Sequence, residues 1–126
     1  MEKKDLKPAG VFKYFEEICQ VPRPSKKEEK MIAYLKAFGA KHNLETKVDE
    51  AGNVLIKKPA TPGKENLQTV VLQSHIDMVC EKNNDIQHDF LTDPIETEID
   101  GEWLKAKGTT LGADNGIGYR AGYPGG

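Results

Sequence analysis

The chain has 126 residues, of which 37% are hydrophobic and 30% charged, and its formal net charge at pH 7 is −2. This length suffices for one domain with a core. The slightly negative net charge and the aromatic content of 7% are not typical of a protein that binds nucleic acid. No apolar run approaches the ~20 residues of a membrane-spanning helix. Residues 1–5 lead into no apolar signal-peptide core, so we expect a cytoplasmic protein that partners neither nucleic acid nor a membrane.

Apolar residues between Leu6 and Cys19 recur at intervals of three and four positions, which is the spacing of one face of an amphipathic helix. The pattern predicts a helix over residues 8–20. Pro22 and Pro24 end this helix, because proline and the residue before it disfavour helical backbone.

A second helix is predicted to follow. Ser25 and Glu28 form a capping-box pattern, in which each side chain satisfies a backbone amide at the start of a helix. Gly39 or Asn43 closes the helix, since both residue types adopt the left-handed conformation found at helix ends. The apolar face of this helix consists of Met31, Ile32, Leu35 and Phe38.

Two hairpins are predicted further along the chain. Residues 44–49 and 53–57 have the composition of strands and flank an Ala-Gly turn. Residues 95–99 and 102–106 flank the dipeptide Asp100-Gly101, which favours a type I′ hairpin turn.

The chain between the two predicted hairpins contains three segments of different composition. Residues 59–66 form a polar loop, and residues 67–74 form a nearly continuous apolar run that is typical of a central strand covered on both faces. Residues 81–94 are expected to be irregular. Helices followed by strands of mixed character indicate an α/β layered domain.

The chain has two cysteines, Cys19 and Cys80, which are far apart and lack CxxC spacing. Cys19 falls on the apolar face of the first helix, and Cys80 ends an apolar segment. Both are predicted to be buried free thiols.

His75 and Asp77 are the first candidates for chemistry. His75 directly follows the predicted central strand, and ligands in open α/β sheets gather beyond the carboxyl ends of strands. In an extended segment the two side chains point to the same side, so Asp77 can hydrogen-bond the ring nitrogen that faces away from a metal. The alternative is a structural histidine paired with a surface aspartate.

Asp114 is the second candidate ligand. It lies with Asn115 in a glycine-rich stretch that has no other charge, and the glycines let a carboxylate project into a cleft. Imidazole and carboxylate are ligands of zinc, so His75 and Asp114 are candidate joint metal ligands. Alternatively Asp114 caps a helix that begins near residue 116, although Asn115 can serve as that cap. His88 is an alternative third ligand, or else packs in the loop before Phe90.

Taken together, these segments resemble the aminoacyl-histidine dipeptidase branch of the M20 metallopeptidases. The resemblance covers about residues 8–119 and depends on four motifs in order, together with an N-terminal match. The motifs are SHIDMV at 74–79, HDF with DPI at 88–95, GEWLKA at 101–106 and the glycine-rich 108–118, and the N-terminal match is FEEICQVPRPS at 15–25.

The resemblance implies a zinc-aminopeptidase-like α/β/α sandwich with a mixed sheet and two zinc ions in the intact family. It implies that His75 binds one zinc, that Asp114 bridges both, and that Asp77 is the catalytic residue that orients the histidine. The implied reaction is hydrolysis of unblocked dipeptides, including Xaa-His, by a metal-bound water. The resemblance also allows a homodimer of the intact enzyme and other divalent metals in place of zinc.

The family pattern continues beyond Asp114 to a glutamate pair, a later aspartate, a distant histidine and an inserted lid domain, and none of these has a match here. We therefore expect residues 1–126 to form part of a catalytic domain, without the lid or dimerisation domain and with an atypical tail at 119–126. We also expect an unpaired apolar sheet edge. The chain is expected to have little or no activity. Two alternatives remain: a non-catalytic remnant that binds at most one metal weakly, and another peptidase of the same clan, such as an aminopeptidase or tripeptidase.

Overall fold

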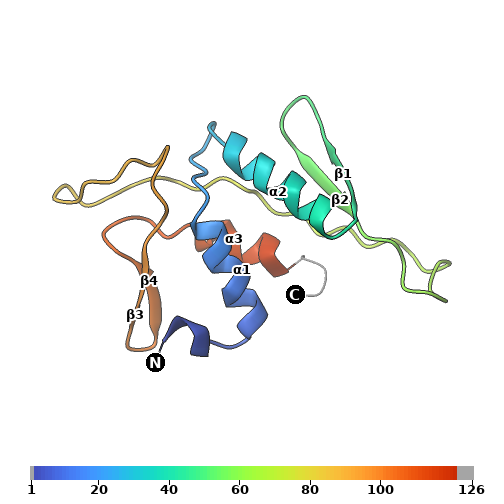
Figure 1. The fold of residues 1–126 in the computed structure, drawn as a ribbon, viewed down its shortest axis with the longest axis horizontal. Coiled ribbons are helices and arrows are strands. Elements are labelled where there is room, and N and C mark those ends of the chain that lie inside the picture. Colours follow the sequence, from blue (N-terminus) through green and yellow to red (C-terminus); the bar gives the residue numbers. More distant parts are fainter. Residues whose placement is uncertain (1, 122–126) are drawn as a thin grey trace.

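The structure is a computed structural model that describes residues 2–121 (Figure 1). The elements in chain order are η1 (Lys3–Asp5), α1 (Ala9–Cys19), α2 (Glu29–Lys41), β1 (Glu45–Val48), β2 (Val54–Lys57), β3 (Thr97–Asp100), β4 (Trp103–Ala106) and α3 (Ala113–Ala121). Residues 122–126 of the predicted atypical tail lie outside the described part.

Helix α1 lies between two apolar clusters and contributes to both, which confirms its predicted apolar face. The cluster against α2 consists of Ile18, Met31, Leu35 and Phe38. The cluster on the other side consists of Phe15, Cys19, Met78 and Ile95. The second cluster brings residues near position 78 under the start of the second hairpin, so the core itself helps to place the segment that carries His75.

Helix α2 forms as predicted and ends at Lys41. Of the two predicted terminators, Asn43 is the one with left-handed backbone, at φ 55°. Gly39 lies inside the helix instead, buried against Thr46 of β1. The helix therefore uses one candidate residue to end and the other to let the first hairpin approach closely.

The predicted capping box at the start of α2 is wrong. The residue at the cap position is Glu28, and no side chain bonds to the helix amides there. The hydroxyl of Ser25 instead contacts the Asp77 carboxylate, and the Glu28 carboxylate accepts a hydrogen bond from the Lys26 amide at 2.7 Å. The pattern lies just before the start of α2, but Ser25 binds Asp77, which is distant in sequence, instead of capping the helix.

Both hairpins are confirmed, and each is a separate two-stranded antiparallel sheet. In the first hairpin Thr46 pairs with Ile56, and in the second Ile99 pairs with Leu104. Gly101 has φ +61°, which is the left-handed conformation that the Asp-Gly turn requires. The β1–β2 hairpin packs on α2, and β3–β4 lies at the opposite end of the molecule near the N-terminus (Figure 1).

The central strand predicted at residues 67–74 is wrong for the described part of the chain. These residues have no strand assignment, and Leu67, Val70, Val71 and Leu72 are 66–79% exposed. A strand needs a neighbour to take its backbone hydrogen bonds. Strands β1 and β2 pair only with each other. The apolar run therefore has no neighbouring strand among the described residues, and no element packs over its side chains. Because this segment belongs to no sheet within residues 2–121, the predicted apolar sheet edge is not formed, and an exposed extended segment takes its place (Figure 1).

Cys19 and Cys80 are free thiols, as predicted. Cys19 is buried and Cys80 half-buried. Burial raises the pKa of the Cys19 thiol to about 12, so it stays protonated near neutral pH.

The described helices and hairpins confirm the α/β class, whereas the mixed sheet of the expected sandwich is not formed by residues 2–121. The parallel pairing in this part of the chain is an isolated bridge between Pro24 and Met78. Among residues 2–121, no helix has the length and apolar character needed to cross a membrane.

Candidate metal site

The segment that carries His75 and Asp77 is held against the turn between α1 and α2. The amide of Met78 donates to the Arg23 carbonyl at 3.0 Å, and the amide of Ser25 donates to the Met78 carbonyl at 3.3 Å. Pro22 and Pro24 favour extended backbone around Arg23, which suits this strand-like pairing. Backbone hydrogen bonds therefore fix the segment immediately after the site residues.

His75 lies between two carboxylates. Its Nε2 atom is 2.9 Å from Asp114 Oδ1, and its Nδ1 atom is 3.0 Å from Asp77 Oδ1. Asp77 and His75 point to the same side, as the alternation of an extended segment predicted. The side chains of Asp77, His75 and Asp114 are 33%, 50% and 95% exposed, so the site opens outward at Asp114.

Asp77 is oriented from its other side by Ser25. The Ser25 hydroxyl donates to Asp77 Oδ2, which leaves Oδ1 for the imidazole. This hydrogen bond, followed by the one from His75, holds the pKa of the Asp77 carboxyl below its usual range, against the opposing effect of burial. Asp77 therefore remains an ionised acceptor that fixes the histidine ring.

The pKa of His75 is raised, first by its hydrogen bond to Asp114 and also by Asp77, while burial opposes the rise. The hydrogen bond between His75 and Asp114 lies where a shared cation would bind, and the raised pKa favours a proton on the imidazole. A metal that bound there would displace this proton, so its affinity would fall as the pH falls.

The loop that carries Asp114 has irregular backbone before the helix proper. Although α3 is assigned as Ala113–Ala121, Asp114 and Asn115 have non-helical dihedral angles, and the peptide bond between them is cis. Gly112 has φ +80°, which only glycine adopts readily. The Asp114 side chain contacts His75 from this irregular turn, and among the described residues no hydrogen bond joins it to the amides of α3.

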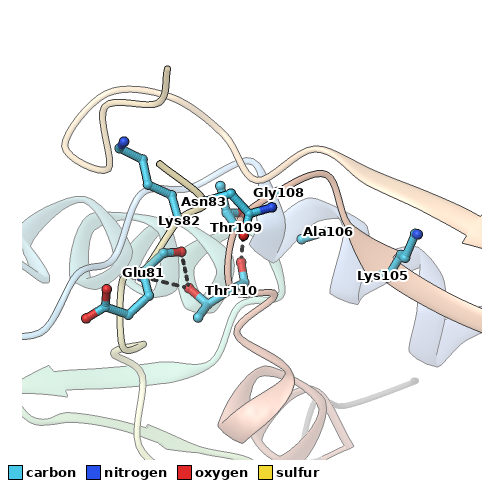
Figure 2. Close-up of a pocket in the computed structure, with 8 residues that line it drawn as sticks. All are labelled: Glu81, Lys82, Asn83, Lys105, Ala106, Gly108, Thr109 and Thr110. Carbon is cyan, nitrogen blue, oxygen red and sulfur yellow. Dashed lines mark hydrogen bonds between the residues drawn. The ribbon is translucent and has the colours of Figure 1, made fainter. Parts of the chain in front are cut away.

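A second set of contacts ties the Asp114 loop to the chain after His75. The Thr110 amide donates to the Glu81 carbonyl at 2.8 Å, and its hydroxyl donates to the Val79 carbonyl at 2.7 Å. Thr110 lies beside Glu81 (Figure 2). Both line a polar cavity of about 430 Å³ whose walls do not include His75, Asp77 or Asp114. The loop is therefore held next to the chain that follows His75.

The His75–Asp114 pair fits part of a zinc site. Ligand atoms lie about 2.0–2.2 Å from zinc, so a nitrogen and an oxygen 2.9 Å apart can both contact one ion. The carboxylate on the opposite ring nitrogen is the usual support of a zinc-binding histidine. Within residues 2–121, however, no group of three or more potential ligands gathers at one point. His88 packs its ring on Phe90 with centroids 4.5 Å apart, as its non-metal alternative predicted.

A cavity of about 460 Å³ borders the site. Its walls come from the start of α2, the turn between β1 and β2, and the segment 73–77, which includes His75 and Asp77. His75 and Asp77 therefore border a hollow large enough for a small molecule, while Asp114 is open to solvent.

The sequence interpretation missed two residues that hold the site, Ser25 and Arg23. The spacing of Ser25 and Glu28 predicts helix capping, and this local pattern conceals the contact of Ser25 with Asp77. Arg23 had no pattern to mark it, apart from its position between two prolines, yet its side chain is 1% exposed and contacts Gly112. Both contacts join residues more than fifty positions apart, which a local pattern does not reveal.

Comparison with known proteins gives strong matches. The chain is 51% identical over 117 residues to the cytosol non-specific dipeptidase of Escherichia coli strain K12, which covers 93% of this chain and 24% of that protein. It superimposes on the crystal structure of the aminoacylhistidine dipeptidase from Vibrio alginolyticus with a TM-score of 0.91 and 53% identity, over 96% of this chain and 25% of the other. No family model matches the sequence.

A tripeptidase from Staphylococcus aureus has a TM-score of 0.65 at 20% identity over 89% of this chain and 29% of its own length, which shows the shared fold alone. The chain thus spans about a quarter of the length of the two dipeptidases. Their similarity confirms the predicted resemblance: over more than nine tenths of its length, this chain is related to dipeptidases of the aminoacyl-histidine type.

Proposed function

We propose that the chain supplies part of the metal centre of a dipeptidase. The observation that carries the proposal is the imidazole of His75 between two carboxylates, at 2.9 Å from Asp114 and 3.0 Å from Asp77. The alternative, a structural histidine paired with a surface aspartate, explains neither the contact of His75 with Asp114 nor the hydrogen bond from Ser25 to Asp77. The identity of 51% to a dipeptidase supports the same function.

Each residue has a distinct role in this proposal. His75 and Asp114 bind the metal through Nε2 and Oδ1. Asp77 accepts the Nδ1 proton of His75, so the ring presents its other nitrogen as a neutral ligand. Ser25 holds the far oxygen of Asp77. When bound, zinc supplies polarisation of the peptide carbonyl and a lowered pKa for a water molecule.

The relatives support a proposal for the substrate and the location of the whole enzyme. We propose that the whole enzyme hydrolyses unblocked dipeptides, including Xaa-His dipeptides such as beta-alanyl-histidine. We further propose that it is an M20 peptidase that uses zinc and that it is located in the cytoplasm. The names of the relatives, a cytosol dipeptidase and an aminoacylhistidine dipeptidase, support this choice. A homodimer of the whole enzyme belongs to the same proposal.

For the 126-residue chain by itself we propose weak binding of one metal and no turnover. Catalytic zinc sites use about three protein ligands per ion, and the pair described here offers two. The second candidate function, a non-catalytic module with one weak metal site, is therefore the expected behaviour of this chain studied alone.

Isothermal titration with Zn²⁺ and an assay with beta-alanyl-histidine test the proposal. The wild-type chain is expected to bind one Zn²⁺, and His75→Ala and Asp114→Ala are expected to lose at least ~10-fold in affinity, since each removes half of the ligand pair. His42→Ala is the matched control, because its ring stacks on Phe38 at the end of α2. Equal affinity in all four proteins would rule out the proposed site. Turnover that a chelator abolishes would show that the chain alone is an active enzyme.

A further inference from the structure

We propose that Arg23 is a positioning residue that holds the Asp114 loop at metal-bridging distance from His75. The inference deepens the proposed function and rests on it for the meaning of that distance. The contact itself is a property of the chain without metal.

Arg23 belongs to the segment that anchors the His75 strand. Its carbonyl accepts the Met78 amide at 3.0 Å, and the bridge between Pro24 and Met78 extends this pairing. The backbone of Arg23 is therefore fixed relative to Asp77, one residue before Met78. A backbone segment that the Arg23 side chain binds is therefore also placed relative to Asp77.

The side chain of Arg23 reaches from this anchor to the other loop. Its Nη2 atom donates to the Gly112 carbonyl at 2.6 Å, two residues before Asp114, and its Nη1 atom donates to the Met78 sulfur at 3.2 Å. The guanidinium is planar and presents several donors in fixed directions, so it can hold two segments at a set separation. One side chain thus spans the two segments that carry the candidate ligands.

The glycines of the second loop make room for this arginine. A Cβ atom at Gly112 would lie 2.7 Å from Arg23 Nη2, and one at Gly116 would lie 2.8 Å from the same atom. The loop therefore has glycine at both places where it passes over the guanidinium. This gives the glycine framing of Asp114 a specific cause, in addition to the freedom that the φ of +80° at Gly112 requires.

Burial separates this arginine from an ordinary surface contact. Arg23 is 1% exposed, and burying a charged side chain is costly unless its hydrogen bonds are made. The contact to Gly112 is therefore maintained rather than exchanged with water. The Thr110 contacts hold the far side of the loop, while Arg23 holds the side nearest Asp114.

Hydrogen–deuterium exchange of the metal-free 126-residue chain tests the proposal, with Arg23→Met as the main variant. The amide of Gly116, which donates to Gly112 at 3.0 Å, reports on the Asp114 loop, and the amides of α2 serve as the internal reference. In Arg23→Met we expect exchange at Gly116 to accelerate by ~10-fold and α2 to change by less than ~2-fold. Arg23→Lys, which retains one charged donor, is expected to give an intermediate result.

The matched control is Leu35→Ala, which opens the cluster between α1 and α2 and leaves the Arg23 contacts to Gly112 and Met78 in place. It is expected to accelerate exchange in α2 more than at Gly116. Uniform acceleration in both regions of Arg23→Met and Arg23→Lys, or wild-type exchange at Gly116 in Arg23→Met, would overturn the positioning role.

A parallel titration with Co²⁺ separates this inference from the proposed function. Arg23→Met is expected to bind Co²⁺ about 10-fold more weakly than the wild type, the usual effect of losing a residue that supports a ligand. Absence of Co²⁺ binding by the wild type would contradict the proposed function, while the exchange data would still decide whether Arg23 positions the loop. Equal Co²⁺ affinity in both proteins, together with faster exchange at Gly116, would contradict the link between loop position and metal binding.

Discussion

At the scale of single residues, the two oxygens of Asp77 have different partners. Oδ1 faces His75, and Oδ2 accepts from the Ser25 hydroxyl. Because both contacts favour the ionised carboxyl, its pKa is lowered, with Ser25 as the largest cause. The folded protein therefore gains stability from Asp77 above the unfolded pKa of about 3.9. That gain is lost as the pH falls through the lower folded value.

Ser25→Ala is expected to raise the pKa of Asp77 toward its ordinary value, and carbon-detected NMR of the Asp77 carboxyl measures the change. The loss of unfolding free energy should be largest above about pH 4 and should disappear as the pH falls through the lowered folded pKa. Ser25→Thr keeps the hydroxyl and is the control. An Asp77 pKa that is equal in Ser25→Ala and the wild type would show that the serine does not orient this carboxylate.

Asp114→Asn is expected to lower the pKa of His75, because the hydrogen bond that the imidazole donates to Asp114 is the largest cause of its rise. A raised histidine pKa adds stability below the unfolded value of about 6.5, and this stability is lost as the pH rises through the folded pKa. The variant should show less of this loss. Proton NMR of the imidazole measures the shift, with Asp85→Asn as a control of equal charge change. If both variants move the His75 pKa equally, only overall charge is acting.

At this scale the sequence predicted the candidate ligands but not the residues that hold them. His75, Asp77 and Asp114 stood out because polar side chains lay in apolar or glycine-rich surroundings. Ser25 and Arg23 act through contacts 52 and 89 residues away in the chain. Pairing of the segment around Pro24 with Met78 places both residues, and no local spacing encodes that pairing.

At the scale of elements, α2 and β1 meet at Gly39 and Thr46. A Cβ atom at Gly39 would overlap the Thr46 hydroxyl and approach Thr46 Cβ to 3.1 Å. Alanine in a helix interior is normally about 1 kcal/mol better than glycine. Here the overlap should exceed that gain, since overpacking costs about 1–3 kcal/mol.

Gly39→Ala is therefore expected to destabilise the chain by about 1–2 kcal/mol in urea unfolding. In a Thr46→Ala background the same substitution should be neutral or stabilising, because the hydroxyl that it meets is gone. A double-mutant cycle over the four proteins measures the coupling. Independent effects of the two substitutions would mean that α2 and β1 do not pack as described.

The exposed segment 67–72 predicts self-association of the chain. Its apolar side chains are uncovered, its backbone lacks a neighbouring strand among the described residues, and it contains no charge to oppose pairing. Val71→Lys is expected to shift the chain toward monomer in sedimentation velocity at high protein concentration. Leu91→Lys, at an apolar residue that is 53% exposed elsewhere, is the control. Equal sedimentation of both variants and the wild type would show that this segment does not drive association.

The sequence predicted elements well where their stabilising contacts are local. Helices α1 and α2 and both hairpins follow from residue spacing and turn chemistry within about 15 residues. The segment 67–74 was predicted as a strand from its apolar content alone. A strand is defined by its neighbour, and composition does not reveal whether a neighbour is within reach.

At the scale of the whole molecule, α1 connects the two apolar clusters and so determines how the candidate site is assembled. Phe15 and Cys19 support Met78, and Arg23 follows four residues after the helix ends. The His75 segment and the Asp114 loop meet because both are attached to this region. The similarity to dipeptidases extends over about a quarter of their length and over more than nine tenths of this chain.

The central claim is that His75 and Asp114 share one cation, and zinc-edge anomalous diffraction tests it most directly. Crystals of the 126-residue chain grown with Zn²⁺ are expected to show an anomalous peak about 2.0–2.2 Å from both His75 Nε2 and Asp114 Oδ1. The Nδ1 atom should remain hydrogen-bonded to Asp77. A peak at His42 or His88 with none between His75 and Asp114 would contradict the claim.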